Sequence, residues 1–486
     1  MATSRGGKRQ QPLLLHSPTP AGAAGRRRFL VFLAVTAALV ASYHHLLAPP
    51  NSSRYHALFL SLGSNATAAA HLRALTLRPH VAGTEVNAAL ARYVFDAFSS
   101  LSFPSHITPY SVLLSYPTHR SLSLAAARGL AARPFALVQE TYKDDPYADA
   151  AAEVIPTYFA YSASGSVAAE VVYANYGHAE DYAYLASRGV DVTGKVALMR
   201  YGDIHCEDMV RNARAAGAAA AILYTDAKDF GGSAAKGEKR KWFPDARWLP
   251  PTGVQVGTLY YGNGDPTTPL WPSCAAGEDC ERLSAEDLSG SEAMPGIPAL
   301  PVSARDGETI LKAMGGDVAP TKWQGGEDAP VYRLGPGPAV LNLTYIIAER
   351  LSKLQAKGWR PRRTIILCSW DAEEFALIGS TEWVEENMDT LASRAIAYLN
   401  VDISIFGPGG LRPRATPQLD ELIKEASKMV PDPDEPSQTL YDTMMRYHPP
   451  SKNILFTTRC MMIMFGWRSL EIPCSTGMSQ WQVFGV

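Results

Sequence analysis

Two short apolar runs in the second half of the chain alternate with a segment of helical spacing. The runs cover residues 364–370 and 395–401, and the helical segment between them covers residues 375–393. Short continuous apolar runs are typical of strands that are buried on both faces of a parallel sheet. The sequence therefore predicts a strand–helix–strand crossover with two parallel strands.

Acidic residues follow both predicted strands. Glu373 and Glu374 come shortly after the first strand, and Asp402 comes directly after the second. Because ligands of open α/β sheets bind outside the carboxyl ends of the strands, we expect these three side chains at one edge. One of two adjacent glutamates can bind a metal while the other takes a proton from water. A Glu-Glu pair is also common at a solvated helix start, so the pattern alone leaves both interpretations open.

The other patterns divide the chain into a helical part and a part with short strands. Helices are expected over residues 57–64, 68–77, 87–98, 209–216 and 346–357. Strands are expected over residues 105–115, 170–173, 195–199 and 220–224. The composition changes at about residue 118, and residues 245–303 are rich in Pro, Gly and Asp, which indicates loops.

The beginning of the chain has the pattern of a membrane anchor. Residues 1–28 are predicted to be a disordered cytosolic tail that ends in three arginines. Residues 29–48 contain no Lys, Arg, Asp or Glu, and about 20 apolar residues suffice to span a bilayer. A cleaved signal peptide is the alternative, but both the basic tail and the apolar run are long for one. The positive-inside rule then predicts a single-pass type II protein with a lumenal or extracellular body, in the endoplasmic reticulum, secretory pathway or plasma membrane.

The candidate glycosylation sites and cysteines are consistent with a lumenal or extracellular body. Three Asn-x-Ser/Thr sequons follow the predicted anchor, at Asn51, Asn65 and Asn342. Cys274 and Cys280 lie six residues apart in a loop that can bend back, so we expect a disulfide between them. Cys206 and Cys368 stand beside apolar residues and are expected to be buried thiols.

Composition and motifs exclude several classes of function. The chain has 45 Lys and Arg against 47 Asp and Glu, which argues against a general nucleic-acid binder. Hydrophobic residues make up 47% of the chain, so most of it can form packed cores. The sequence has neither a Gly-x-Ser-x-Gly elbow nor a His-Glu-x-x-His motif, which argues against a serine hydrolase and a zincin.

One longer motif carries a family resemblance. Trp-Asp-Ala-Glu-Glu-Phe at residues 370–375, followed by Ile-Gly-Ser-Thr-Glu-Trp at residues 378–383, resembles the glutamate carboxypeptidase II family of dinuclear zinc peptidases. The resemblance is in particular to plant members of the altered-meristem-program type. Supporting stretches lie at residues 71–76, 79–84, 332–338 and 358–364, and the resemblance runs from about residue 56 to 450. Segments at residues 194–196, 212–218 and 222–226 resemble the protease-associated domain of large zinc exopeptidases.

The resemblance implies an α/β fold of the zinc-exopeptidase type. Its mostly parallel sheet, incomplete in this chain, would carry an inserted protease-associated α+β domain and an N-terminal transmembrane helix. The implied boundaries are a stem and first peptidase part at 49–115, the protease-associated domain at 116–340, a second peptidase part at 341–450, and a tail without family pattern at 451–486. Family members are homodimers that release C-terminal glutamate from small acidic peptides.

The resemblance also implies roles for individual residues. Glu373 matches the general base, and Glu374 and Asp402 match ligands of the two zinc ions. Arg200 and Arg412 match contacts to the substrate carboxylate, which suits a bidentate guanidinium. The residues that match a structural calcium site are Thr268, Trp271 through its carbonyl, Glu382 and Glu385. The alternative for the last two is a solvated helix face.

The chain departs from the family pattern at the metal ligands. No histidine occurs between His205 and His448, and the strand and helix that carry a zinc histidine and the bridging aspartate are absent before residue 346. Residues 451–486 contain neither the distal zinc histidine nor the helical dimerisation domain. The chain therefore resembles an internally deleted and C-terminally altered form, and strand 364–370 is expected to have unpaired edges. Because catalytic zinc has three protein ligands, we expect impaired activity; the alternative is an inactive, membrane-anchored binding ectodomain.

The predicted topology can be tested by glycosylation. We expect glycosidase treatment of the protein expressed in eukaryotic cells to increase its electrophoretic mobility, because the sequons follow the anchor on the lumenal side. An unchanged mobility, with the body open to protease from the cytosolic side of sealed vesicles, would contradict the topology.

Overall fold

The computed structural model describes eleven segments of the chain. They are residues 62–125, 132–142, 145–232, 240–243, 245–246, 248–275, 278–353, 365–401, 411–413, 415–447 and 481–485. Internal contacts divide the chain into units Met1–Ala70 and His71–Val486. The predicted anchor 29–48, Asn51, Asp402 and most of the tail 451–486 lie outside the described residues. Within the described segments, no helix is both long and apolar enough to cross a membrane.

Two helices of the first peptidase part match the sequence pattern. Helix α3 covers Asn65–Thr76, and α4 covers Glu85–Ser100. The hydroxyl of Thr84 caps α4 by accepting a hydrogen bond from the amide of Asn87. The predicted helix 57–64 lies almost wholly outside the described residues.

A seven-stranded mixed sheet forms the largest part of the fold. Its strand order is β2-β1-β9-β4-β5-β6-β8. The strands are β1 Ser111–Leu124, β2 Arg133–Pro134, β4 Gly165–Tyr173, β5 Val196–Arg200, β6 Ala220–Tyr224, β8 Ala299–Val302 and β9 Val340–Lys353. Strands β4, β5, β6 and β8 are parallel, whereas β1, β2 and β9 pair antiparallel. These four parallel strands lie in the predicted protease-associated domain, whereas the mostly parallel sheet was expected for the peptidase domain, whose described strands form the smaller sheet below.

Short helices accompany the parallel strands. They are η1 Ala148–Glu153, α5 Ala179–Ser187, α6 Cys206–Ala215, α7 Ala227–Phe230, α8 Ala285–Gly290, α9 Ala304–Ala313 and η2 Thr321–Trp323. A separate pair, β3 Phe159–Ala160 with β7 Gly257–Thr258, is parallel. Strands β5 and β6 lie within one residue of the predicted boundaries, whereas helix α6 begins three residues before the predicted start at residue 209.

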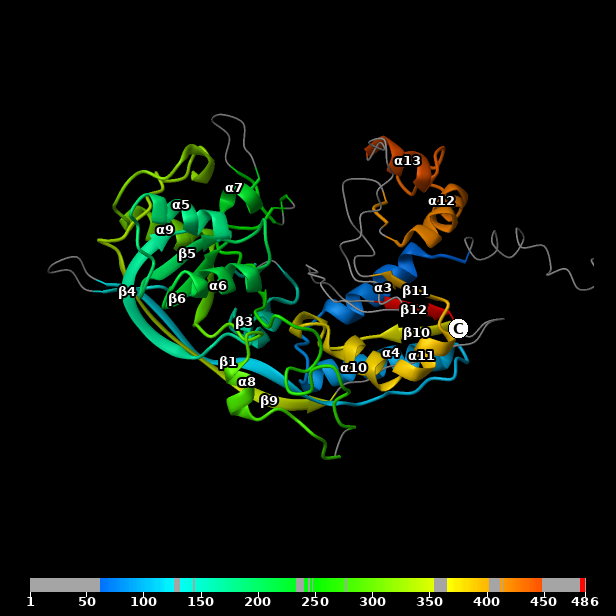
Figure 1. Ribbon diagram of the computed structural model, residues 1–486. Helices are drawn as coiled ribbons and strands as arrows, with labels where there is room; N and C mark the ends of the chain where they lie inside the picture. Colours follow the sequence, from blue (N-terminus) through cyan, green and yellow to red (C-terminus); the bar gives the residue numbers. More distant parts are fainter. Residues whose placement is uncertain are drawn as a thin grey trace, which may run out of the picture. The chain divides into compact units, whose positions relative to one another are not determined.

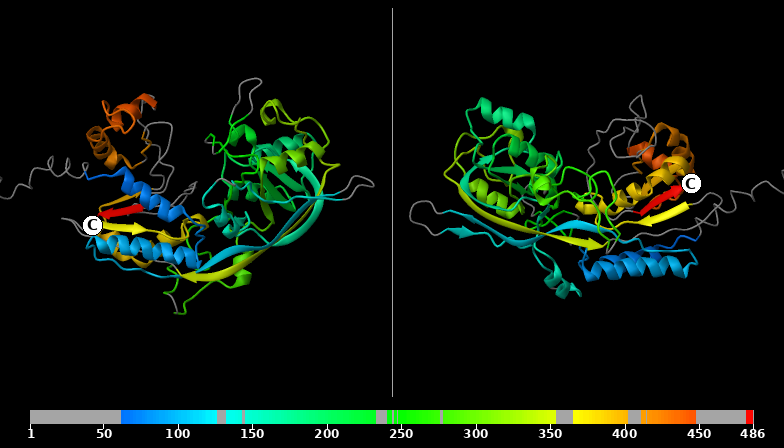
Figure 2. Two further views of the ribbon diagram at one scale, coloured as in Figure 1. Left: turned by 180° about the vertical axis from the view of Figure 1, so that it is seen from behind. Right: turned by 60° about the horizontal axis from the view of Figure 1, so that its bottom comes forward.

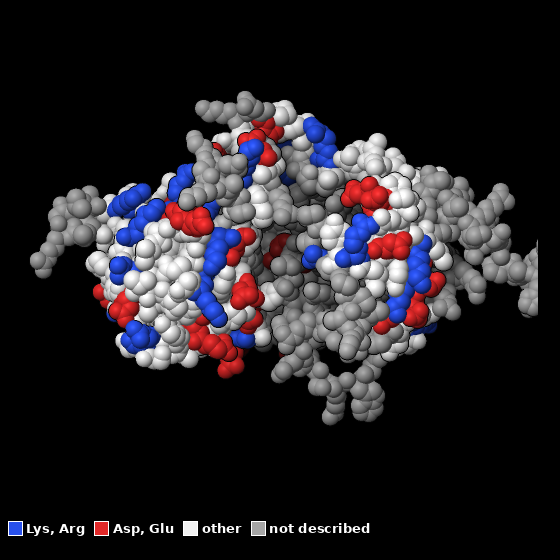
Figure 3. All heavy atoms as spheres, turned by 90° about the horizontal axis from the view of Figure 1, so that it is seen from above, with Lys and Arg blue, Asp and Glu red and all other residues white. Residues whose placement is uncertain are grey.

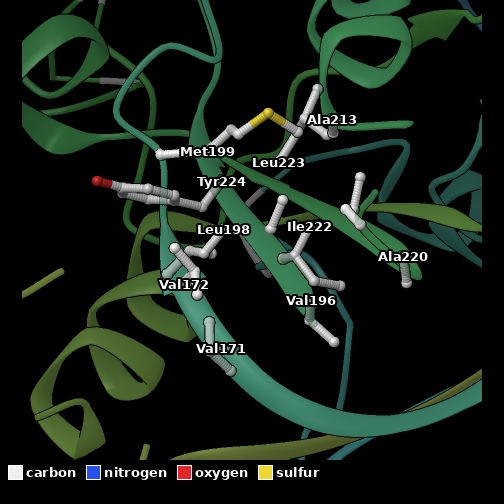
Figure 4. Close-up of a cluster of buried hydrophobic side chains, with 14 of the residues drawn as sticks. Val171, Val172, Val196, Leu198, Met199, Ala213, Ala220, Ile222, Leu223 and Tyr224 are labelled. Carbon is white, nitrogen blue, oxygen red and sulfur yellow. The ribbon is translucent and has the colours of Figure 1, made fainter. Parts of the chain in front are cut away.

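The core of the parallel part is formed by aliphatic and aromatic side chains. Strands β5 and β6 are buried along their whole length, because helices cover the sheet. Figure 4 shows Val196, Leu198 and Ile222 from these strands packed beside Val172 of β4. Burial on both faces explains why β6 reads as a continuous apolar run rather than an alternating one.

Strand β9 forms where the sequence predicted a helix. Residues 346–357 were expected to form an amphipathic helix, but β9 remains extended to Lys353. Its residues 341–353 pair with β1, and residues 340–345 also pair with β4. Figures 1 and 2 show the long pairing of β1 with β9. The prediction failed because the ladder on β1 outweighs the local helix preference. Strand β1 also begins at Ser111, later than the predicted strand 105–115.

A smaller sheet of three strands carries the acidic motif. Its order is β10-β12-β11, with β10 Ile365–Ser369, β11 Ala397–Val401 and β12 Trp481–Gly485. Strand β12 is antiparallel to both neighbours. The crossover between β10 and β11 consists of η3 Glu373–Phe375, α10 Ile378–Glu386 and α11 Met388–Arg394 rather than one helix. The last described helices are η4 Pro417–Leu419, α12 Asp420–Met429 and α13 Leu440–Tyr447.

This small sheet corrects the predicted strand environments. Strands β10 and β11 run parallel, as expected, but β12 lies between them. One edge of β10, expected to be unpaired, is therefore paired. Strand β11 is not buried on both faces, because Leu399 and Val401 are 45% and 41% exposed. A second hydrophobic core joins Cys368 and Trp370 to Trp383 of α10.

Gly379 has a steric role at the start of α10. A Cβ atom at this position would lie 2.5 Å from the carbonyl oxygen of Asp371, which accepts a hydrogen bond from the Gly379 amide. We expect Gly379→Ala to lower the free energy of unfolding by about 1–3 kcal/mol, because backbone atoms must shift. Gly290→Ala is the matched control, since a Cβ there has no neighbour within 4 Å. Chemical denaturation checks both variants, and equal stabilities would contradict the steric argument.

Candidate active site

The acidic motif lies on a tightly turned loop after β10. Ala372, Ala376 and Leu377 have φ values of 54°, 78° and 60°, which is the left-handed region that non-glycine residues seldom adopt. The Leu377 amide donates to the carbonyl of Glu373 at 2.7 Å, and the Ile378 amide donates to that of Ala372 at 3.2 Å. Three strained residues around η3 indicate that the position of the motif is constrained by its surroundings.

Asp371 anchors this loop to the first peptidase part. Its carboxylate accepts hydrogen bonds from the Asn87 side-chain amide of α4 at 2.5 Å and from the Ala372 amide at 2.7 Å. Burial raises the pKa of Asp371, while these two hydrogen bonds oppose the rise. The contact joins residues 284 positions apart in the sequence, so the loop depends on α4 for its place.

The two glutamates of the motif differ in exposure. Glu373 is half-buried on η3, and Glu374 is exposed. Glu374 lies within electrostatic range of Tyr201, which follows β5: the pKa of Tyr201 is raised by burial and then by Cys206, Glu207 and Glu374. Glu374 thus adds to the negative surroundings of Tyr201.

The structure does not assemble a zinc site within the described residues. Asp402 lies outside them. Val401, which directly precedes Asp402, and Ser369 at the end of β10 both pair with Trp481 of β12. Among the described side chains, no group of three His, Cys, Asp or Glu is arranged to hold a metal ion. The described donors thus do not fit the zinc centre that the sequence resemblance implies, and the convergence of Glu373, Glu374 and Asp402 stays a prediction.

A buried acidic cluster lies next to the motif, formed by Asp265, Glu382 and Glu385. Glu382 is 0% exposed, and its two carboxylate oxygens accept hydrogen bonds from the amides of Asp265 at 2.6 Å and Ser273 at 2.7 Å. The Ser273 hydroxyl bonds to Asp265 at 2.8 Å and lies 2.7 Å from the hydroxyl of Thr268. The acidic cluster therefore joins α10 to the loop that contains two of the predicted calcium ligands.

The acidic cluster has more negative charge than its neighbours balance. Arg282 pairs with Asp265 at 2.8 Å. Burial, followed by Glu382 and Asp265, raises the pKa of Glu385 to about 8, and burial raises that of Glu382 to about 7. One oxygen of Glu385 is buried without a hydrogen-bond partner. Among the described residues, this cluster therefore has a surplus of buried carboxylate that Arg282 balances only in part.

The predicted substrate arginines lie in different surroundings. Arg200 is 0% exposed at the end of β5, where it lies near Asp226 at 3.6 Å and donates to Asn175 at 3.0 Å. The ring of Tyr176 covers its guanidinium at 4.5 Å. Arg412 is exposed in a short described segment. The two terminal nitrogens of Arg200 thus already donate to protein oxygens, and its contact with a substrate stays a prediction, as does that of Arg412.

The structure contains the predicted disulfide. Cys274 and Cys280 are joined, while Cys206 and Cys368 are buried free thiols, as the sequence predicts. The side chain of Trp271 in the same loop donates to the Glu281 carbonyl at 3.2 Å.

Sequence reasoning missed Asp265, Arg282 and Asn87. Asp265 had a local signal, since Asp-Pro-Thr is typical of an Asx turn, and its carboxylate accepts from the Thr267 amide at 2.8 Å. Arg282 and Asn87 had none, because their partners are distant in the sequence.

Comparison with protein families identifies two parts of the chain. The PA domain family matches residues 163–260, and Peptidase family M28 matches residues 344–447. The first match covers β4, β5 and β6, and the second covers the acidic motif and both strands beside it. Among solved structures, an aminopeptidase from Aneurinibacillus sp. strain AM-1 is 17% identical over 62% of this chain and 46% of that chain. Its TM-score of 0.30 is too low to establish a common fold.

Curated relatives are similar over most of the chain. The probable glutamate carboxypeptidase LAMP1 of Arabidopsis thaliana is 46% identical over 81% of this chain and 62% of that protein. The probable glutamate carboxypeptidases AMP1 of Arabidopsis thaliana and VP8 of Zea mays are 37% and 36% identical, again over 81% of this chain. The chain spans 59% and 58% of their lengths, so it matches about three fifths of these relatives. The chain is therefore similar to plant probable glutamate carboxypeptidases over about three fifths of their length, and it combines PA domain sequence with Peptidase family M28 sequence.

Proposed function

We propose that this chain is a glutamate carboxypeptidase-type ectodomain that has kept the glutamate loop but hydrolyses peptides poorly. The observation that carries the proposal is the absence of histidine between His205 and His448, an interval that includes the whole retained motif. The relatives are named probable glutamate carboxypeptidases, and the sequence resemblance implies small acidic peptides as substrates and a dinuclear zinc centre in the full-length enzymes. Zinc would supply an activated water, and Glu374 and Asp402 alone are too few ligands to hold it well.

The retained residues still have a chemical role under this proposal. Glu373 is half-buried on a constrained loop, which is a suitable place for a general base. Arg200 and Arg412 would bind carboxylates of the peptide. A general base without an activated water has little to deprotonate. We therefore expect the chain to bind the peptide although it hydrolyses it poorly.

A binding ectodomain without catalysis is the second candidate. The observation in its favour is that the PA part is fully formed, with β5 and β6 entirely buried, although the peptidase part lacks the family's metal ligands. Peptide binding that is unaffected by chelator and by loss of Glu373 would favour this candidate.

We further propose that the body faces the lumen or the extracellular space, anchored through residues 29–48. The exposed sequons at Asn65 and Asn342 and the Cys274–Cys280 disulfide support an oxidising compartment. Figure 3 shows basic and acidic side chains interspersed on the face of the molecule that it presents. Homodimers, as in the family, would need a dimerisation domain that residues 451–486 do not resemble.

Activity and zinc content test the main proposal. We expect the purified ectodomain to bind well below two zinc ions per chain and to release no measurable glutamate from an acidic dipeptide. Elemental analysis and a glutamate assay, each with and without chelator, measure this. Glu373→Gln is the control that assigns any activity to the loop, and chelator-sensitive hydrolysis lost in this variant would overturn the proposal.

We also propose that the acidic cluster binds calcium with Thr268 and the carbonyl of Trp271. The raised pKa values of Glu382 and Glu385 mean that the folded chain keeps protons that the unfolded chain has already lost. Stability is therefore greatest below the unfolded pKa and falls as pH rises from about 4.5 to about 8. A bound cation compensates the repulsion and stabilises the ionised form.

Thermal unfolding tests this calcium site. In chelator, we expect the unfolding temperature to fall between about pH 5 and about pH 8. Calcium at about 100 times its Kd should restore about 2.7 kcal/mol near pH 8 and much less near pH 5. Glu385→Gln should abolish the calcium effect and reduce the pH effect, since Glu382 still titrates, whereas the half-buried control Glu308→Gln on α9 should retain both. Calcium stabilisation that persists in Glu385→Gln would exclude the acidic cluster as the site.

A further inference from the structure

The three-stranded sheet is completed by a segment that resembles nothing in the family. Strand β12 consists of residues 481–485, which lie far in sequence from both strands it pairs with. Residues 365–369 of β10 face residues 485–481 in unbroken register, and residues 397–401 of β11 face the same five residues from the other side. One five-residue segment therefore satisfies one backbone edge of each neighbour.

The space that β12 occupies is one strand wide. Strands β10 and β11 run parallel to each other, and each lies about 4.8 Å from β12. Without β12 the two strands would be about 10 Å apart, too far for mutual hydrogen bonds, and each would present a row of unpaired amide and carbonyl groups. We call this space between β10 and β11 the strand slot.

The strand slot ends beside the candidate active site. Trp481 of β12 is the register partner of Ser369 and also of Val401. Ser369 precedes the loop with Glu373, and Val401 precedes Asp402. The occupant of the slot therefore sets the spacing between the two strand ends that carry the acidic residues.

We propose that the strand slot is a binding site for an extended peptide, and that residues 481–485 of this chain are its built-in ligand. The recognition is β-strand addition, in which backbone hydrogen bonds supply most of the affinity. Valine, phenylalanine and tryptophan, which favour strands, make up three of the five residues of the built-in ligand. When the built-in ligand is removed, the slot accepts the same sequence as a free peptide, in antiparallel orientation to both neighbours.

Cross-linking in the full chain tests the register. Gln482 is the register partner of the native free thiol Cys368, and directly paired strand residues have Cα separations within disulfide range. We expect Q482C to form a disulfide with Cys368 under mild oxidation, identified by non-reducing peptide mapping. The matched control is V483C, because a shift of one residue turns the introduced side chain to the other face, so at least about tenfold less cross-link is expected.

Peptide binding to a shortened chain tests the slot itself. We expect the variant without residues 481–486 to bind a fluorescent peptide of residues 479–486, and the full chain to bind it at least about tenfold more weakly. A peptide with V483P should bind the shortened chain at least about tenfold more weakly than the unmodified peptide, since proline removes a ladder amide from a central strand. If the shortened chain does not fold, the cross-linking pair still tests the register of β12 in the full chain.

Three outcomes would overturn the proposal. Equal cross-linking of Q482C and V483C would show that the register is wrong. A disulfide between two chains rather than within one would make a second copy the occupant. A folded shortened chain that binds neither peptide would show that the slot does not accept strands.

Discussion

The pairing of β9 with β1 on one side and β4 on the other is the constraint on which the rest of the described structure depends. Strand β9 joins β1, which follows the first peptidase part, to β4 of the parallel sheet. It ends at Lys353, and the next described strand is β10, which precedes the acidic motif. Long-range antiparallel pairing of this length specifies a register, because a slip of one residue would move Leu341, Leu343 and Tyr345 out of the core.

Buried charge is handled in two different ways in the structure. In the parallel part, Arg200 is fully buried but lies among acidic and amide partners, so its charge is compensated by the protein. In the acidic cluster, Asp265 and Glu382 are fully buried and Glu385 partly so, and Arg282 supplies one positive charge. A surplus of carboxylate in a low-dielectric site is costly unless it is protonated or bound to a cation. This difference separates a structural ion-pair network from a candidate ligand site.

The chain has the family's glutamate loop but not the histidines of its metal site, and this combination determines its chemistry. The loop with Glu373 keeps its supporting contacts to Asn87 and to the start of α10, although the chain has no histidine near it in sequence. Support of a loop and ligation of a metal are separate tasks performed by separate residues, so one can persist without the other. The strand slot extends the same reasoning to the sheet, where a segment outside the family pattern pairs with two family strands.

The sequence by itself determined the local elements and the class of protein. Strands β5, β6 and β10, helices α3, α4 and α6, the disulfide and the family motif all depend on residues close together in the chain, where periodicity and short spacing are informative. Only the tertiary structure decided that residues 346–353 form a strand, that Arg200 is buried, that Asp265 joins Glu382 and Glu385, and that β12 lies between β10 and β11. Each of these depends on partners far away in sequence, and backbone pairing and burial of charge are set by those partners rather than by local preference.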